Sequence, residues 1–245
     1  MPNVFLGQIV TRLWGENCYV LSPRPTGPAL VVDPGQGAAQ ACRRLLRSHR
    51  LSLAGVLCSH GHLDHVADAA ELADHFQVPV FIHDDDLELL TRPGLGLDDA
   101  LVRQLLGVDR LPAPSRVESV GHGQRLELAG VEIEVQSAPG HTPGSVLYLV
   151  SGDGQPLCDL DGRPRAEASE KTDLCFSGDV LFAGSIGRTD LPGGSMEQTR
   201  RSLRDVVLAL PDDLLVWPGH GPSTTLAAER AHNPYLQRRF LEDRP

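Results

Sequence analysis

The chain has 245 residues, of which 41% are hydrophobic and 22% charged, and its formal net charge is −10. This composition is typical of a folded protein with a large core, and the negative charge argues against binding to nucleic acid or to an anionic membrane. The five cysteines are widely spaced, so neither a disulfide framework nor a thiolate zinc site is expected. Without a signal sequence or an apolar run long enough to span a membrane, the protein is expected to be cytoplasmic.

Strand-like and helix-like segments alternate through the first third of the chain. Short apolar runs predict four strands, at residues 4–10, 17–22, 28–33 and 53–58. Apolar residues at helical spacing predict two helices, at residues 37–48 and 66–76. The third strand ends at the turn signal Pro34-Gly35, and the fourth ends at a cluster of histidines.

The same alternation continues through the rest of the chain. Residues 126–128 and 131–135 alternate between apolar and polar on either side of Ala129-Gly130, which predicts an antiparallel hairpin with one buried face. The polar segment 152–172 is rich in glycine and proline, which predicts an exposed loop insertion between strands. The remaining predicted elements are a strand at 145–150, a helix capped by Ser195, a strand at 214–217 and a helix at 225–231. We therefore expect one domain, residues 1–245, of the mixed α/β (α+β) class, with helices outside packed sheets.

Three histidines and an aspartate lie within six residues, directly after the fourth predicted strand. The segment is His60-Gly61-His62-Leu63-Asp64-His65. His60 and His62 are two residues apart, so in an extended backbone both side chains point the same way. Asp64 and His65 begin the next turn and can face a neighbouring site. Imidazole and carboxylate together suit zinc, and also iron or manganese, whereas the alternative interpretation is a polar surface turn.

Three later loops each place one ligand-type residue beside glycines at the end of a strand, the second of them after a further short apolar run, residues 174–176. These residues are His141, Asp179 and His220. Glycine lets the backbone turn sharply and pass close to a cluster of side chains. Each of the three would more often be structural if it occurred alone. Together with the histidine segment they predict one metal site built from several loops.

The ordered set of these elements, from Asp33 to His220, resembles the metallo-β-lactamase superfamily. The resemblance implies a four-layer αβ/βα sandwich with two divalent metal ions on the rim of the sheets, zinc being expected and iron or manganese being alternatives. It also implies that Asp33 is a carboxylate that fixes a ligand imidazole from behind. The implied ligands are His60, His62 and His141 for one ion, Asp64, His65 and His220 for the other, and Asp179 bridging the two.

Within the superfamily, the segment 177–188 is similar to the glyoxalase II-type branch, which acts on hydroxyacylglutathione. The leading hypothesis is therefore a metal-dependent hydrolase that splits a thioester, S-lactoylglutathione or a related 2-hydroxyacyl thioester, into hydroxy acid and thiol. Two cations would lower the pKa of a shared water and stabilise the oxyanion, and Asp64 and Asp179 would be catalytic as well as ligands. The expected partner is thus a small-molecule thioester.

Several alternatives remain open at this stage. Residues 221–245 are too few for the C-terminal domain with which long glyoxalase II enzymes bind glutathione, so another low-molecular-weight thiol carrier is possible. Arg188 either binds an anionic end of the substrate or pairs with Asp190. The runner-up function is an iron-dependent persulfide dioxygenase of the same fold, to which residues 187–190 are also similar. An electron-transfer module and a nuclease are disfavoured, because the chain has no room for a flavin domain and no added RNA-binding segment.

Overall fold

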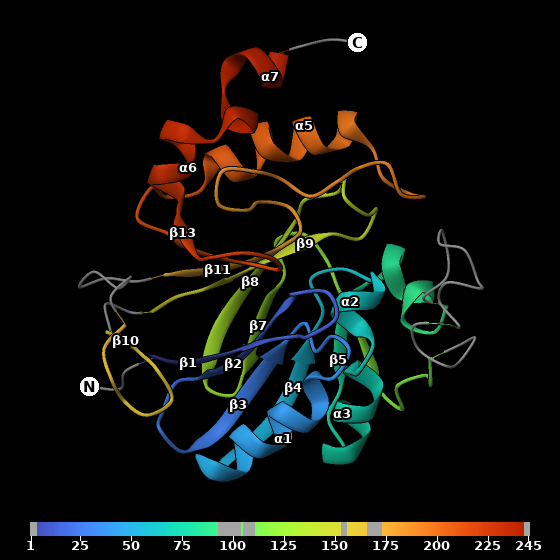
Figure 1. Ribbon diagram of the computed structural model, residues 1–245, viewed down its shortest axis with the longest axis vertical. Helices are drawn as coiled ribbons and strands as arrows, with labels where there is room; N and C mark the ends of the chain where they lie inside the picture. The colour runs from blue at the N-terminus through green and yellow to red at the C-terminus, as the bar shows by residue number, and fades with distance from the viewer. Residues whose placement is uncertain (1–3, 93–103, 105–110, 153–155, 166–172, 243–245) are drawn as a thin grey trace.

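Two β-sheets pack face to face, and each is covered on its outer side by helices (Figure 1). The computed structural model describes residues 4–92, 104, 111–152, 156–165 and 173–242. The order of layers is helix, sheet, sheet, helix, so the expected four-layer sandwich of mixed α/β class is confirmed. Three apolar clusters fill the spaces between successive layers.

The first sheet has seven strands in the order β10-β1-β2-β3-β4-β5-β6. Strands β1 to β3 are antiparallel, and β3 to β6 run parallel to one another. Helices α1 (Ala38–Ser48) and α3 (Ala69–Phe76) follow β3 and β4 and cover the outer face. The strand bounds are β1 (Val4–Val10), β2 (Asn17–Ser22), β3 (Gly27–Val32), β4 (Leu51–Leu57), β5 (Val80–His83), β6 (Val117–Val120) and β10 (Leu157–Cys158).

The second sheet has six strands in the order β13-β12-β11-β9-β8-β7. The predicted hairpin is confirmed, because Leu128 pairs with Val131 and the turn residues Ala129 and Gly130 have φ of 55° and 80°, as a tight two-residue hairpin requires. The strand bounds are β7 (Arg125–Leu128), β8 (Val131–Ser137), β9 (Val146–Val150), β11 (Leu174–Gly178), β12 (Leu215–Pro218) and β13 (Thr224–Thr225).

Helices from the C-terminal third of the chain form the layer on the outer face of the second sheet. Its longest helix begins after Ser195, whose hydroxyl accepts a hydrogen bond from Gln198 N at 3.3 Å, so the predicted N-cap is confirmed. The helices are α5 (Met196–Asp205), α6 (Leu226–His232) and α7 (Arg238–Glu242), with short 3₁₀ turns η2 (Val207–Ala209) and η3 (Pro234–Leu236). Two further short helices are α2 (Leu63–Val66), which forms the second half of the histidine segment, and η1 (Asp84–Leu90).

The segment 152–172 contributes more to the fold than a loop. Residues 153–155 and 166–172 of the expected insertion lie outside the described part of the chain. Leu157 and Cys158 form β10, which pairs in parallel with β1, and they are only 1% and 2% exposed. A two-residue strand is too short to show periodicity, so only the packing of distant segments reveals it. Strands β5 and β6 and the turn η1 are likewise absent from the predicted elements.

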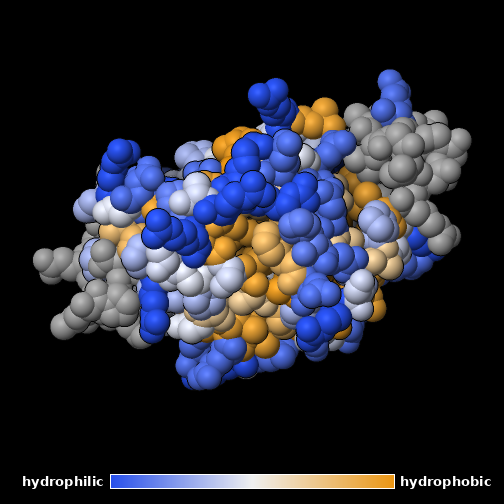
Figure 2. Space-filling model, turned by 90° about the horizontal axis from the view of Figure 1, so that it is seen from below, coloured by the Kyte–Doolittle hydropathy of each residue, from blue (hydrophilic) through white to orange (hydrophobic). Residues whose placement is uncertain are grey.

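Seen from below, the molecule shows a hydrophobic area in the middle of this face, with hydrophilic side chains around it (Figure 2). Some apolar residues that pack against the core between the sheets are only partly buried, among them Ala54, Leu126 and Leu128. Among the described helices, none is both long and apolar enough to cross a membrane.

Candidate metal centre

The predicted ligands meet at one rim of the sandwich because the strands that precede them end there. In the first sheet β3 and β4 are parallel, and in the second sheet β11 and β12 are parallel. Strand β8 runs in the same direction as β11, since both are antiparallel to β9. The segments that follow β4, β8, β11 and β12 therefore emerge at the same edge, as in other sheets whose parallel strands carry functional loops. Each of these four segments carries predicted ligands.

Three histidines form the first ligand group. His141 Nε2 lies 2.8 Å from His62 Nδ1 and 3.2 Å from His60 Nε2. His60 is 1% exposed and His141 is 5% exposed. Three imidazole nitrogens that converge at these distances have the arrangement of a three-histidine metal site.

The second ligand group combines one carboxylate with two histidines. Asp64 Oδ2 lies 3.1 Å from His220 Nε2 and 3.8 Å from His65 Nε2. Asp179 lies between the two groups, with Oδ1 at 3.2 Å from His65 Nε2 and Oδ2 at 3.5 Å from His141 Nε2. Its Oδ2 is also 3.7 Å from His220 Nε2. The fold thus brings all seven predicted ligands together and places Asp179 where it faces both groups.

Two histidines of the first group, His60 and His62, have lowered pKa values that suit metal binding. Burial lowers the pKa of His62 to about 4, and the neighbouring His141 adds to this effect. Burial also lowers the pKa of His60 well below its ordinary value. Both imidazoles are therefore neutral at pH 7, and a nitrogen lone pair of each is available to a cation.

The carboxylates make the second group a favourable place for positive charge. Burial by itself raises the pKa of Asp64 and of Asp179, but the neighbouring histidines, His65 first among them, together outweigh it and both pKa values are lowered. Burial by itself lowers the pKa of His65, but the surrounding carboxylates outweigh it and raise this pKa. Among the described residues, His65 Nε2 and Asp179 Oδ1 are buried without a hydrogen-bond partner. An imidazole nitrogen and a carboxylate oxygen that are buried without a hydrogen-bond partner are suitable ligands for a divalent cation.

Asp33, which the resemblance implies to fix a ligand imidazole from behind, lies next to His65 of the second group. It follows β3 directly, is 2% exposed, and has an unusual positive φ of 49° for a residue other than glycine. Its Oδ2 accepts from His65 Nδ1 at 3.0 Å and from Ser59 Oγ at 2.6 Å, and its Oδ1 accepts from Ser59 N at 2.6 Å. Because His65 Nδ1 is occupied in this way, its Nε2 is directed at the ligand cluster.

The sequence interpretation missed Asp86, which joins two of the ligand-bearing segments. Asp86 lies in η1 and is 0% exposed. Its carboxylate accepts hydrogen bonds from Gly61 N at 2.8 Å, Gly144 N at 2.8 Å and Thr142 Oγ1 at 2.7 Å. Gly61 separates two ligand histidines, and the other two donors follow His141. In the sequence Asp86 is the last of three consecutive aspartates, and nothing in the local pattern distinguishes it from its exposed neighbours.

Glu16 and Asn17 were also missed, and both lie against the His220 segment. Asn17 Nδ2 donates to Pro218 O at 2.9 Å and to Gly221 O at 2.8 Å, so it holds the backbone on both sides of His220. Glu16 pairs with His220 through its backbone, is 0% exposed, and has no hydrogen-bond partner for either carboxylate oxygen among the described residues. Burial raises the pKa of Glu16 well above its ordinary value.

Arg188 contributes to the centre through its backbone. Its carbonyl oxygen accepts from His141 Nδ1 at 2.7 Å. Its guanidinium binds the Asp190 carboxylate at 2.6 and 2.8 Å, and these side chains are 61% and 68% exposed. The preceding Gly187 packs so tightly that an added Cβ would lie 1.9 Å from Asp179 O, so a side chain cannot be accommodated there.

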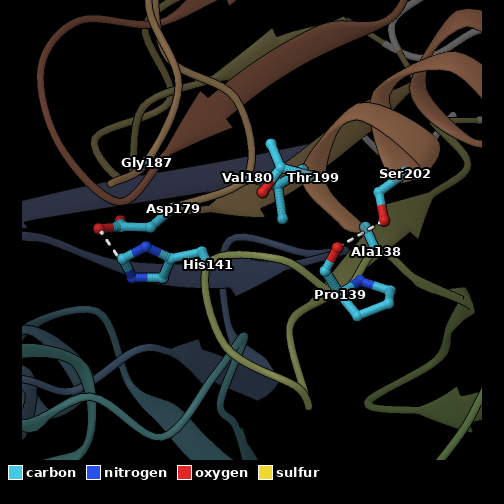
Figure 3. Close-up of a pocket in the computed structure, with 8 residues that line it drawn as sticks. All are labelled: Ala138, Pro139, His141, Asp179, Val180, Gly187, Thr199 and Ser202. Carbon is cyan, nitrogen blue, oxygen red and sulfur yellow. Dashed lines mark hydrogen bonds and ion pairs between the residues drawn. The ribbon is translucent and has the colours of Figure 1, made fainter. Parts of the chain in front are cut away.

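A small cavity lies behind Asp179 and His141, toward α5 (Figure 3). Asp179 and His141 lie on one side of it, and Thr199 and Ser202 of α5 lie on the other (Figure 3). Its volume of about 10 Å³ is room for one water molecule and too little for a substrate. The centre is more open at the second group, where the His220 side chain is 28% exposed and the Asp64 side chain 22%.

Comparison with known proteins agrees with this arrangement. A sequence model of the Metallo-beta-lactamase superfamily matches residues 11–154 and 168–220. The hydroxyacylglutathione hydrolase GloC of Haemophilus influenzae is 33% identical over 229 residues, covering 90% of this chain and 92% of that protein. The solved structure of BLEG-1, a B3 metallo-beta-lactamase, is 31% identical with a TM-score of 0.74, covering 95% of this chain and 99% of that chain. The structure of TTHA1623 in a di-iron-bound form is 31% identical with a TM-score of 0.69, covering 94% of this chain and 100% of that chain.

Proposed function

Because the chain belongs to the metallo-beta-lactamase superfamily, we propose that it is a metal-dependent thioester hydrolase of the glyoxalase II-like type. Its proposed substrate is a 2-hydroxyacyl thioester, S-lactoylglutathione or the thioester of another low-molecular-weight thiol. The observation that carries this proposal is the position of Asp179 between two groups of nitrogen and oxygen ligands, on a rim with one more open side. The likeness to GloC supports the choice of a thioester over other substrates.

The superfamily implies a binuclear metal site, and the residues at this rim fit it. When bound, two divalent cations supply Lewis acidity and lower the pKa of a coordinated water. We propose zinc as the metal, with iron as the alternative because a solved relative holds two iron ions. Nitrogen and carboxylate ligands accept either metal, so elemental analysis of protein purified without added metal decides between them.

The chain's own residues perform the remaining tasks. The lowered pKa of Asp64 keeps its carboxylate ionised at neutral pH, so it can accept a hydrogen bond from water at the open side of the centre. Asp33 and Ser59 hold His65 and His60 in fixed orientations, which reduces the reorganisation needed during reaction. We propose Asp64 and Asp179 as the catalytic carboxylates.

The test is a direct comparison of three chemistries. The purified protein is offered S-lactoylglutathione without oxygen, glutathione persulfide with oxygen, and a chromogenic β-lactam. Anaerobic release of free thiol is the expected result. Oxygen consumption with the persulfide and no release of thiol would instead identify a persulfide dioxygenase. Hydrolysis of the β-lactam alone would identify a lactamase.

The proposed role of Arg188 in binding substrate has its own test. Its guanidinium is exposed, so a carboxylate of the thiol carrier can compete with Asp190 for it. Arg188→Ala is expected to raise KM roughly tenfold and to change kcat little. The contact between the guanidinium and the substrate carboxylate would be equally strong in the ground state and the transition state, so its loss weakens binding without slowing the chemical step. Arg201→Ala removes an equally exposed arginine that pairs with Glu197, and it serves as the control. Unchanged kinetics in Arg188→Ala would limit this side chain to its pair with Asp190.

A further inference from the structure

Two buried polar residues at the end of α6 have no role in the centre as described so far. Glu229 is 4% exposed and Asn233 is 0% exposed, and neither lies in a ligand-bearing segment. Burying a carboxylate and an amide costs free energy unless their hydrogen bonds are satisfied inside the protein. The partners of these two side chains therefore indicate what their burial accomplishes.

Glu229 binds the backbone of a turn in the segment that follows Asp179. Its Oε2 accepts from Gly184 N at 2.8 Å and from Asn233 Nδ2 at 2.8 Å. Its Oε1 accepts from Thr224 Oγ1 at 2.7 Å. The carboxylate thus connects α6 to the turn and is itself held in place by Asn233.

Asn233 binds the same turn at two carbonyl oxygens. Its Nδ2 donates to Ser185 O at 3.0 Å, and because this nitrogen has only two hydrogens, the longer contact to Phe182 O at 3.3 Å shares one of them with a shorter bond. The turn is closed by hydrogen bonds in both directions between Phe182 and Ser185, at 3.0 and 3.3 Å. Three main-chain groups of residues 182–185 are therefore bound by side chains from the C-terminal layer.

The segment 182–188 in turn contacts one ligand histidine from each group. The Phe182 ring meets the His220 imidazole edge-on, with centroids 6.0 Å apart and planes at 87°. At the other end of the segment, Arg188 O accepts from His141 Nδ1. A Cβ added at Gly187 would lie 2.9 Å from His141 Nδ1, so the backbone at Gly187 packs directly against this histidine.

We propose that Glu229 and Asn233 are positioning residues of the metal centre. They hold the segment 182–188 in place, and through it the orientations of His220 and His141. The competing interpretation is that they only attach α6 to the sheet. Apolar residues such as Leu226 and Leu241, which are 0% and 8% exposed, already bury that layer against the sheet. The proposal goes beyond the proposed function, because it holds whichever substrate the centre acts on.

The test separates metal affinity from stability. Wild-type protein and the variants Asn233→Ala and Leu241→Ala are each purified with their metal and titrated with a competing chelator. Ions retained per chain and melting temperature are measured for each. Leu241→Ala is the matched control, because it weakens the apolar packing of the same helical layer and leaves the hydrogen bonds of Glu229 and Asn233 to the turn in place. Asn233→Ala is expected to release metal at about tenfold lower chelator concentration, as changes behind metal ligands commonly do, while Leu241→Ala retains metal like the wild type.

Two further variants keep the test decisive if Asn233→Ala does not fold. Glu229→Gln keeps the side-chain volume and removes the negative charge that strengthens the hydrogen bonds from Gly184 N and Asn233 Nδ2, and it is expected to weaken metal binding in the same direction. Phe182→Leu leaves the polar contacts intact and removes only the ring against His220. It is expected to weaken binding with a melting temperature close to that of the wild type. Equal metal retention in Glu229→Gln, Phe182→Leu and Leu241→Ala would overturn the proposal.

Discussion

At the scale of single residues, the centre depends on carboxylates that are not themselves ligands. Asp33 orients His65, and Asp86 joins the backbone of the histidine segment to that of the His141 segment. Both side chains are buried and both of their oxygens accept hydrogen bonds, so the cost of burying these polar groups is offset inside the protein. Ligand geometry is therefore held by hydrogen bonds to groups behind the ligands.

Replacing Asp86 by asparagine tests this role at constant side-chain size. The amide offers one acceptor oxygen where the carboxylate offers two, so at least one of its three donors loses its partner. We expect a loss of about 1–3 kcal/mol in the free energy of unfolding, measured by urea denaturation, because a buried donor is left unsatisfied. Asp85→Asn changes an exposed neighbour and is the control. Equal stability of the two variants would contradict the role of Asp86.

Glu16 predicts a pH dependence of stability. Its pKa in the folded protein lies well above the ordinary value of 4.5, because burial disfavours the charged form. The unfolded chain releases this proton more readily than the folded protein does. The stability that protonated Glu16 contributes to the free energy of unfolding is therefore fully present below about pH 4.5 and is lost as the pH rises through the pKa of the folded state.

Glu16→Gln is neutral at every pH and should remove this part of the pH dependence. Relative to the wild type, the variant is expected to gain stability as the pH rises from 5 toward 8. Urea unfolding of both proteins across that range measures the difference. Glu127→Gln, at an exposed position in β7, controls for the change in net charge. Parallel pH profiles of wild type and Glu16→Gln would show that Glu16 is ionised in the folded protein.

At the scale of elements, the short strand β10 and the residues after it close one edge of the sandwich. Arg165 lies just beyond β10, and its guanidinium stacks 4.9 Å from the centroid of the Trp217 ring in the second sheet. The same guanidinium donates from Nη2 to Leu6 O in the first sheet at 3.1 Å. One side chain from the expected insertion therefore joins the two sheets beside β12, the strand that precedes His220.

Arg165→Lys removes the planar guanidinium while keeping the charge. We expect the variant to lose about 1–2 kcal/mol of stability, because the stacking contact and the directed hydrogen bond to Leu6 are both weakened. The midpoint of urea unfolding measures this loss. Arg163→Lys, whose side chain is 78% exposed, is the matched control and should behave as the wild type. A wild-type midpoint for Arg165→Lys would show that the closing contact adds no stability.

At the scale of the whole molecule, the metal centre lies where the two halves of the sandwich meet. Buried tyrosines cross between the sheets toward it: Tyr19 donates to Pro218 O at 2.7 Å, and Tyr148 donates to Cys58 O at 3.0 Å. Each accepting residue lies within two positions of a ligand histidine. The ligands themselves come from both halves, with His60 to His65 following the first sheet and the others following strands of the second. Ions bound at this rim would therefore connect the two sheets.

Metal removal should accordingly destabilise the entire fold. An ion present at one hundred times its dissociation constant adds about 2.7 kcal/mol to the stability of the folded state. Treatment with a chelator is expected to lower the melting temperature cooperatively, and restoring the metal should reverse the change. Calorimetry of the untreated, chelated and reloaded protein makes the comparison. A chelated protein that loses its metal but keeps its melting temperature would show that the ions do not hold the sheets together.

The amino-acid sequence by itself determined the features that depend on local pattern. Period-two alternation predicted the hairpin at Ala129-Gly130, a capping residue predicted the start of α5, and the ordered histidines and aspartates predicted which side chains converge. Only the tertiary structure decided the contacts between distant segments: β10 against β1, Asp86 between two loops, Asn233 on the turn after Asp179. Each of these rests on one or two residues whose local sequence is compatible with an exposed position. Their role comes from burial, which the fold imposes and which then requires each polar group to find a partner.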